Sequence, residues 1–154
     1  MPDVFTKSKR SEVMSLIRSA GNKSTELAMI RVFRECGITG WRRGRKVKIS
    51  ETGNVKPEGG ETRIIRPDFV FRDRKVALFV DGEFWHGHPT LCRIPATRRA
   101  WWLAKIGGNR ARDRKQTRLL RKSGWTVVRI WQHELERKHI SLALCKLRSA
   151  GLLA

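Results

Sequence analysis

The sequence predicts an α/β protein in which helices cover a mixed sheet. Two short apolar runs, Phe69–Phe71 and residues 75–80, are separated by a tight polar turn, which is the pattern of a buried hairpin. A third apolar run, residues 125–131, follows a long basic segment of helical character. Helical patterns before the hairpin and after the third run supply the covering layers.

Two helices are expected before the hairpin. The first spans residues 6–19, and its thin apolar stripe suits either the body of the protein or a phosphate backbone. The second begins after a cap at Ser24 or Thr25 and continues to Cys36, where Gly37 is a suitable stop.

The remaining elements follow from local composition. Residues 41–49 are basic and predict a strand or strand edge, and residues 49–63 are polar and rich in glycine, which predicts a loop or a hairpin tip. Residues 109–122 predict a strongly basic helix, and residues 132–149 predict a last helix. No repeat or linker interrupts the chain, so we expect one domain.

The charge of the chain restricts its partners. Lysine and arginine outnumber aspartate and glutamate 34 to 14, which gives a formal net charge of +20. Nucleic acid is the first candidate partner for so basic a domain. Membrane is the second, but no apolar anchor or signal peptide is seen. Cys36, Cys92 and Cys145 are odd in number and far apart, which favours a reducing, intracellular location over a disulfide framework.

Two carboxylates bracket the predicted hairpin. Asp68 precedes its first strand and Asp81 ends its second, so antiparallel pairing would bring the two side chains to one end of a buried sheet. Oxygen ligands of this kind suit a divalent cation. Each Asp alone could simply cap a turn or end a strand. With Glu83, His86 and His88 close behind, we favour a metal-dependent site.

Cations and aromatic residues alternate after this site. Arg98 and Arg99 stand beside Trp101 and Trp102, which suits backbone contact combined with base stacking. The alternative is that one or both tryptophans belong to the core. Asp113 is the lone acid in the basic helix, and the simpler interpretation is a salt-bridged surface residue.

Several motifs in combination resemble the very short patch repair (Vsr) endonucleases, over nearly the whole chain. The most specific are FWHGHP and the spaced pattern of Pro, Trp, Lys, Asn and Asp residues that follows it. The matching stretches are RSEVMSLIRSAGNKSTE, RPDFVF, VDGEFWHGHP, PATRRAWWLAKIGGN, RARDR and GWTVVRIWQHEL. The resemblance implies a three-layer α/β/α restriction-endonuclease-like core with a mixed central sheet, formed by residues 1–154 as one domain. It also implies an N-terminal helical segment, in residues 1–22, that contacts DNA.

The resemblance implies an enzyme that nicks one strand of duplex DNA beside a T:G mismatch and uses Mg²⁺. Asp68 matches the family's metal-binding Asp, and Asp81 lies at a strand-end position that is His in some members. The histidine that activates water falls on His86. The other implied residues are Asp113, which orients His86, Glu26 in the second helix, and Val80, whose carbonyl is a further metal ligand. Glu26 could alternatively only complement the helix dipole.

Contacts with DNA are also implied. An aromatic wedge that enters the duplex beside the mismatch falls on three residues, and unstacking costs least at a mismatch. These residues are Phe84, Trp85 and Trp102. The polar residues expected to hold DNA are Arg98, Arg99, Asn109 and Arg110.

The sequence departs from the family at a structural zinc site. Glu83 stands where the family has a Cys ligand, while His88, Cys92 and His133 fall at or near the other ligand positions. Zinc accepts such donors, so a structural Zn²⁺ is expected. Alternatively Glu83 joins Asp81 at the catalytic metal, because the two lie on one face of an extended segment. The other departure is the long insertion at residues 49–63.

Two other functions remain open. One is a sequence-specific restriction- or homing-type nuclease on the same fold, because specificity depends on a few groove contacts. The other is an inactive, basic DNA-binding protein, which the joint presence of Asp68, Asp81, His86 and Asp113 disfavours. We expect a cytoplasmic, nucleoid-associated monomer with double-stranded DNA as its partner, no membrane contact, and mismatch-repair proteins as candidate partners.

Overall fold

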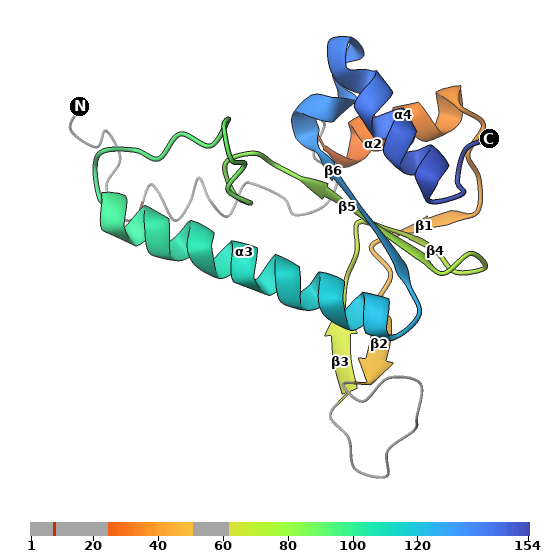
Figure 1. The fold of residues 1–154 in the computed structure, drawn as a ribbon, viewed down its shortest axis with the longest axis horizontal. Coiled ribbons are helices and arrows are strands. Elements are labelled where there is room, and N and C mark those ends of the chain that lie inside the picture. Colours follow the sequence, from red (N-terminus) through yellow and green to blue (C-terminus); the bar gives the residue numbers. More distant parts are fainter. Residues whose placement is uncertain (1–7, 9–24, 51–61) are drawn as a thin grey trace.

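A computed structural model describes residues 8, 25–50 and 62–154 (Figure 1). The helix expected at residues 6–19, apart from Ser8, and most of the insertion at residues 49–63 lie outside the described residues. In chain order the elements are α2 (Glu26–Glu35), β1 (Trp41–Arg43), β2 (Val47–Ser50), β3 (Thr62–Ile65), β4 (Phe69–Phe71), β5 (Val76–Asp81), α3 (Arg99–Lys122), β6 (Thr126–Trp131), the 3-10 turns η1 (Gln132–Leu135) and η2 (Arg137–His139), and α4 (Ile140–Ser149).

The expected mixed sheet is confirmed. Its four strands lie in the order β1-β4-β5-β6, with β1 and β4 antiparallel, β4 and β5 antiparallel, and β5 and β6 parallel. The predicted hairpin is β4–β5, with Phe69 opposite Leu78 and Phe71 opposite Val76. A right-handed crossover is the usual way to join parallel strands such as β5 and β6, and the connection here contains α3.

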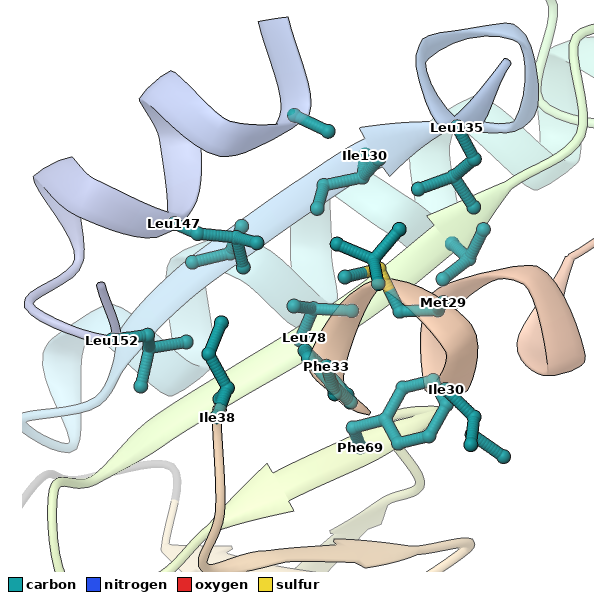
Figure 2. Packing of buried hydrophobic residues seen from close by; sticks show 14 of the residues in the cluster. Met29, Ile30, Phe33, Ile38, Phe69, Leu78, Ile130, Leu135, Leu147 and Leu152 are labelled. Atoms are coloured by element: carbon teal, nitrogen blue, oxygen red, sulfur yellow. The ribbon is translucent and has the colours of Figure 1, made fainter. Parts of the chain in front are cut away.

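Side chains alternate across β5, so each face of the sheet has its own hydrophobic cluster. Val76, Leu78 and Val80 pack with α2 and α4, where Phe33, Met29 and Leu147 are fully buried (Figure 2). Ala77 and Phe79 belong to a second cluster that includes Leu119 and Leu120 of α3. In Figure 1, α3 accordingly lies on the opposite side of the sheet from α2 and α4. The central strand β5 is buried along its whole length.

The segment at residues 41–49 forms two strands instead of one. β1 joins the main sheet and β2 pairs with β3 in a separate two-stranded sheet. The chain turns between them at Gly44, which has a φ of 60°, a left-handed conformation that favours glycine. Because β2 and β3 are antiparallel, with Val47 opposite Ile65, the insertion joins the two strands of a hairpin.

Two helix boundaries differ from the prediction. α3 begins at Arg99, ten residues before the expected start, and runs through Gly107 and Gly108. Each glycine costs a helix about 1 kcal/mol, but burial of Ile106 in this turn favours continuation. The last helix begins only at Ile140, because Glu136 takes an extended conformation between the two 3-10 turns.

The second helix has the predicted extent. Thr25 occupies the position before α2 but makes no side-chain cap hydrogen bond, and Gly37 follows its end with a φ of 65°. Cys36, Cys92 and Cys145 are all free thiols. No helix in the described part of the chain is long and apolar enough to cross a membrane.

Candidate active site

The Asp68 carboxylate is held at the end of the β4–β5 hairpin. Its Oδ2 atom accepts a hydrogen bond of 2.7 Å from the backbone amide of Val80, on the neighbouring strand. Burial raises the pKa of Asp68 to about 6, against the lowering effect of the Val80 bond, and the charges of Glu26 and Asp81 raise it further. The antiparallel hairpin therefore does bring acidic groups together, as the spacing predicted.

Glu26 reaches this acidic region from the first turn of α2. Its carboxylate is buried and accepts a hydrogen bond of 2.7 Å from Nε of Arg43 on β1. Since its charge raises the pKa of Asp68, Glu26 lies close enough to interact with that group. Glu26 is therefore more than a partner of the helix dipole, although its role in catalysis stays a prediction.

His86 and Asp113 form a close pair between a loop and α3. The Nδ1 atom of His86 lies 2.6 Å from Oδ2 of Asp113. Gly87 permits this approach: its φ is 62°, and a Cβ added there would lie 2.7 Å from Ile106 and 2.8 Å from Arg110. The predicted base and its orienting acid are thus brought together, and Asp113 is not an isolated surface acid.

The Asp113 contact selects one tautomer of His86. A carboxylate accepts hydrogen bonds, so Nδ1 carries the proton and the lone pair of a neutral imidazole is on Nε2. Burial lowers the pKa of His86, but the Asp113 hydrogen bond and the charges of Asp81 and Asp113 outweigh burial and raise it above its ordinary value. Burial likewise raises the pKa of Asp113, but His86 and Arg129 hold it below its usual range.

Arg129, which the sequence analysis did not single out, binds the carboxylates on both sides of His86. Its Nε and Nη2 atoms lie 2.8 and 3.0 Å from the two oxygens of Asp81, and Nη2 is 3.2 Å from Oδ1 of Asp113. A signal was present in the sequence, because Arg129 is the one charged residue within the apolar run of β6.

These carboxylates offer oxygen ligands for the expected divalent metal. Asp68 fits, because a half-buried carboxylate crowded by the charges of Glu26 and Asp81 is stabilised by a cation, and Mg²⁺ commonly uses one or two carboxylates with several waters. Each oxygen of Asp81 accepts one hydrogen bond from Arg129 and keeps a second lone pair, so Asp81 can offer an oxygen to a metal ion while Arg129 stays bound. Among the described residues, no group of three or more His, Cys, Asp or Glu side chains is arranged to hold a metal ion.

The expected zinc ligands lie near one another but do not converge. Glu83 accepts hydrogen bonds from the backbone amide and Nδ1 of His133, at 2.6 and 2.9 Å. His88 uses Nδ1 to accept backbone amides from Thr90 and Leu91, so its proton is on Nε2 and neither nitrogen offers a free lone pair. The thiol of Cys92 is directed to the Phe84 carbonyl. This donor arrangement does not fit zinc.

The contacts of Glu83 also indicate whether it belongs with the nearby histidines or with the catalytic metal site. Partial burial raises the pKa of Glu83, but hydrogen bonds from its own amide and from His133 outweigh burial and hold the pKa below its ordinary value. The rings of His88 and His133 lie 5.0 Å apart, and His88 packs on Trp131. Glu83 thus belongs to this histidine cluster, and the arrangement disfavours the alternative in which it joins the catalytic metal.

The residues of the predicted wedge form one aromatic cluster. Phe84 lies 5.2 Å from Trp85 and 5.1 Å from Trp102, between ring centroids, and all three are half-buried. Trp101 packs on Trp102 at 4.7 Å but is 53% exposed, so it is not a core residue. The amide of Asn109 donates to the Trp85 carbonyl at 2.9 Å, which holds the loop against α3.

A basic cleft of about 590 Å³ opens beside the His86–Asp113 pair. One wall is α3, where Arg110, Arg114 and Arg118 repeat at four-residue intervals and so lie on one helix face. Arg98 and Arg99, at the far end of the helix, are exposed and do not line this cleft. The lining residues are Asp81, His86, Arg110, Asp113, Arg114, Thr117, Arg118, Arg121, Lys122, Arg129 and Trp131.

Comparisons with known proteins identify the class to which this fold and site belong. The family described as DNA mismatch endonuclease Vsr matches residues 61–91. A type II nicking enzyme, V.NmeDIP of Neisseria meningitidis serogroup C, is 36% identical over 135 residues, which cover 86% of this chain and 80% of that protein. The class is therefore that of DNA endonucleases.

Two further relatives match over a shorter stretch. V.NaeI, a type II nicking enzyme of Lentzea aerocolonigenes, is 46% identical over 70 residues, 46% of this chain and 42% of its own length. The DNA mismatch endonuclease Vsr of Escherichia coli strain K12 is 44% identical over 68 residues, 44% of each chain. The matches thus span less than half the length of these two proteins. The chain belongs to the Vsr family.

Proposed function

We propose that this protein is an Mg²⁺-dependent endonuclease that nicks one strand of duplex DNA beside a T:G mismatch. The observation that carries the proposal is the 2.6 Å contact between His86 and Asp113, on the same sheet end as the half-buried Asp68. Membership of the Vsr family supports DNA as the substrate, and the family also implies a three-layer restriction-endonuclease-like core.

His86 is proposed to act as the general base. With Nδ1–H directed to Asp113, Nε2 is free to accept a proton from a water molecule as that water attacks phosphorus. Asp113 stabilises the positive charge that then develops on the imidazole. The bond from phosphorus to the 3′ oxygen breaks, and the departing oxygen carries the negative charge until it is protonated.

Asp68 is proposed to hold Mg²⁺, with the Val80 carbonyl and Asp81 as the further ligands that the family implies. A divalent cation at this position supplies Lewis-acid polarisation of the phosphate and neutralises charge on the departing oxygen. The Val80 amide fixes one oxygen of Asp68 through a bond of 2.7 Å, which limits the directions in which the other can point. Glu26 adds negative charge to the same region.

Mismatch preference is proposed to depend on Phe84, Trp85 and Trp102. Aromatic residues inserted between base pairs must unstack them, and that cost is lower at a mismatch than in matched duplex. The basic cleft contributes affinity that does not depend on sequence. We also propose that the enzyme acts as a monomer and that mismatch-repair proteins are its candidate partners.

The deciding experiment compares strands and substrates. Purified protein with Mg²⁺ is incubated with a matched duplex and with an otherwise identical T:G duplex, each carrying a different label on each strand. The expected product is one cut in one strand of the T:G duplex. Cutting of both strands in matched DNA of one sequence would favour a restriction-type nuclease, and binding without cutting would favour an inactive DNA-binding protein.

A further inference from the structure

Side chains along β6 point alternately to the two faces of the sheet, and this alternation directs Arg129 to the face covered by α3. Its neighbours Val128 and Ile130 pack in the cluster of α2 and α4, so Arg129 projects from the other face. There its guanidinium lies 4.4 Å from the centre of the Phe79 ring, on the paired position of β5. This stacking holds the guanidinium plane and leaves its nitrogen atoms directed to polar groups at the rim of the basic cleft.

All three guanidinium nitrogens of Arg129 have a partner. Nε and Nη2 bind the two oxygens of Asp81 as a fork, Nη2 also lies 3.2 Å from Asp113, and Nη1 donates to Thr117 at 3.2 Å. The two oxygens of Asp113 therefore have different partners: Oδ1 contacts Arg129, and Oδ2 contacts Nδ1 of His86.

Asp81 faces the same nitrogen of His86. Its Oδ1 atom lies 3.6 Å from Nδ1, beyond hydrogen-bond distance, while the Asp113 oxygen lies at 2.6 Å. Two carboxylates thus compete for one N–H group, and the Arg129 fork holds Asp81 at the longer distance. Without that fork the buried Asp81 carboxylate and the half-buried Asp113 carboxylate would repel each other, and Asp81 would be free to accept the Nδ1–H hydrogen bond that orients the ring.

We propose that Arg129 is a positioning residue for the nicking reaction: it fixes Asp81 and Asp113 so that only Asp113 holds His86. The proposal rests on the proposed function in so far as His86 is the base. It assigns Arg129 no contact with DNA, although Arg129 lines the same cleft as the arginines of α3. A point charge cannot replace it, because lysine lacks the planar fork that binds both oxygens of Asp81.

The test compares Arg129→Met and Arg129→Lys with Arg118→Met, a control that removes another cleft arginine. Single-turnover cleavage at saturating T:G duplex should fall about 10²-fold in Arg129→Met, the scale of a small misplacement of a reacting group. Its DNA affinity and salt slope should be unchanged. Arg129→Lys should be almost as slow, and added guanidinium should accelerate Arg129→Met but not Arg118→Met. Arg118→Met should instead bind every duplex more weakly, with a shallower salt slope.

A second measurement does not need cleavage. Imidazole ¹⁵N–¹H spectra, assigned with a His86→Ala variant, report the Nδ1–H proton of His86 and the hydrogen bond it makes. The expected result is a single Nδ1–H resonance in the parent, where Asp113 accepts it, and a displaced or second Nδ1–H resonance in both Arg129 variants, where Asp81 competes for it. An unchanged Nδ1–H resonance in both variants, or an Arg129→Met enzyme with the parent's rate, would overturn the proposal. Failure of the parent to cleave would overturn only the proposed function, because the spectra would still decide the role of Arg129.

Discussion

His86 and Asp113 are 27 residues apart in sequence, and their side chains meet at 2.6 Å because the loop after β5 packs against the middle of α3. This contact fixes which nitrogen of the ring can accept a proton. It also gives the pair a measurable dependence on pH.

His86→Ala should slow single-turnover cleavage by about 10²–10⁴-fold if His86 is the base. In the parent enzyme the rate should rise with pH, because only neutral imidazole accepts a proton. Since the pKa of His86 is raised, the rise should come above the ordinary range for histidine. Asp113→Asn removes the Asp113 charge and its charged hydrogen bond, and leaves only Asp81 to raise this pKa, so the rise in rate should move to lower pH. A rate in His86→Ala equal to the parent's across pH 6–9 would make His86 a structural residue.

Asp68→Asn should abolish cleavage, leave duplex binding largely intact and increase stability at neutral pH. Burial raises the pKa of Asp68 to about 6, so the folded state binds the proton more tightly than the unfolded state does. Stability is therefore lost as pH rises from about 4 to about 6, by on the order of 2–3 kcal/mol.

Thermal unfolding with and without Mg²⁺ measures this effect directly. Mg²⁺ should raise the melting temperature of the parent and not that of Asp68→Asn, because only the parent has a charged carboxylate at position 68. Equal Mg²⁺ stabilisation of both proteins would remove Asp68 from the metal site.

The histidine cluster around Glu83 should be stable without zinc. The Glu83–His133 hydrogen bonds suggest that EDTA leaves the melting temperature unchanged, whereas His133→Ala lowers it with or without EDTA. Because the pKa of Glu83 is lowered, its contribution to stability is present at neutral pH and is lost as pH falls through the folded pKa. About one zinc per chain after purification without chelator would restore the sequence-based prediction.

Trp85→Ala should lose the preference for mismatched duplex and keep the parent's salt slope, because stacking is not ionic. Changing Arg98 and Arg99 together to Ala should do the reverse, with weaker binding to every duplex and a shallower slope. Trp101→Ala is the matched control for the tryptophan change, since Trp101 contacts the cluster only through Trp102. A salt titration of binding gives all three results. An unchanged mismatch-to-match ratio in Trp85→Ala would contradict the wedge.

The two flanks of α3 should differ in their contribution to binding. Arg114 and Arg118 line the basic cleft, while Arg112 and Lys115 line a separate pocket beside β3. Changing the first pair to Ala should reduce the salt slope by about 2, at roughly 0.9 per phosphate neutralised. The second pair removes the same charge and should change the slope less. Equal losses would mean that net charge, and not the cleft, holds the DNA.

The sequence predicted the parts of the site that depend on local pattern. Antiparallel pairing of two apolar runs placed Asp68 beside the end of β5, and the composition of residues 109–122 predicted a strongly basic helix. It did not predict Arg129, whose role depends on a diagonal contact across parallel strands. Such contacts depend on strand register, which an apolar run alone does not define.

Helix boundaries were harder to predict for a similar reason. The helix was predicted to begin at residue 109, but α3 already includes Gly107 and Gly108, because burial of Ile106 beside Gly87 is a tertiary effect that local propensity does not include. The expected zinc ligands Glu83, His88, Cys92 and His133 were residues of the right chemical type, but residue type does not define where their lone pairs point. Only the structure indicates that backbone amides already occupy the His88 lone pair.

The unbroken length of α3 has a consequence for where a cut can fall. Trp102 belongs to the aromatic cluster and Asp113 contacts His86, the proposed general base. The two residues are 11 positions apart on one continuous helix, about 16 Å along its axis. If the cluster marks the mismatch, α3 sets a fixed distance between the mismatch and the reacting phosphate, and the nick lies at a constant offset from the lesion. One residue inserted at Gly107 would lengthen that distance by about 1.5 Å and turn the two ends of the helix by about 100° relative to each other.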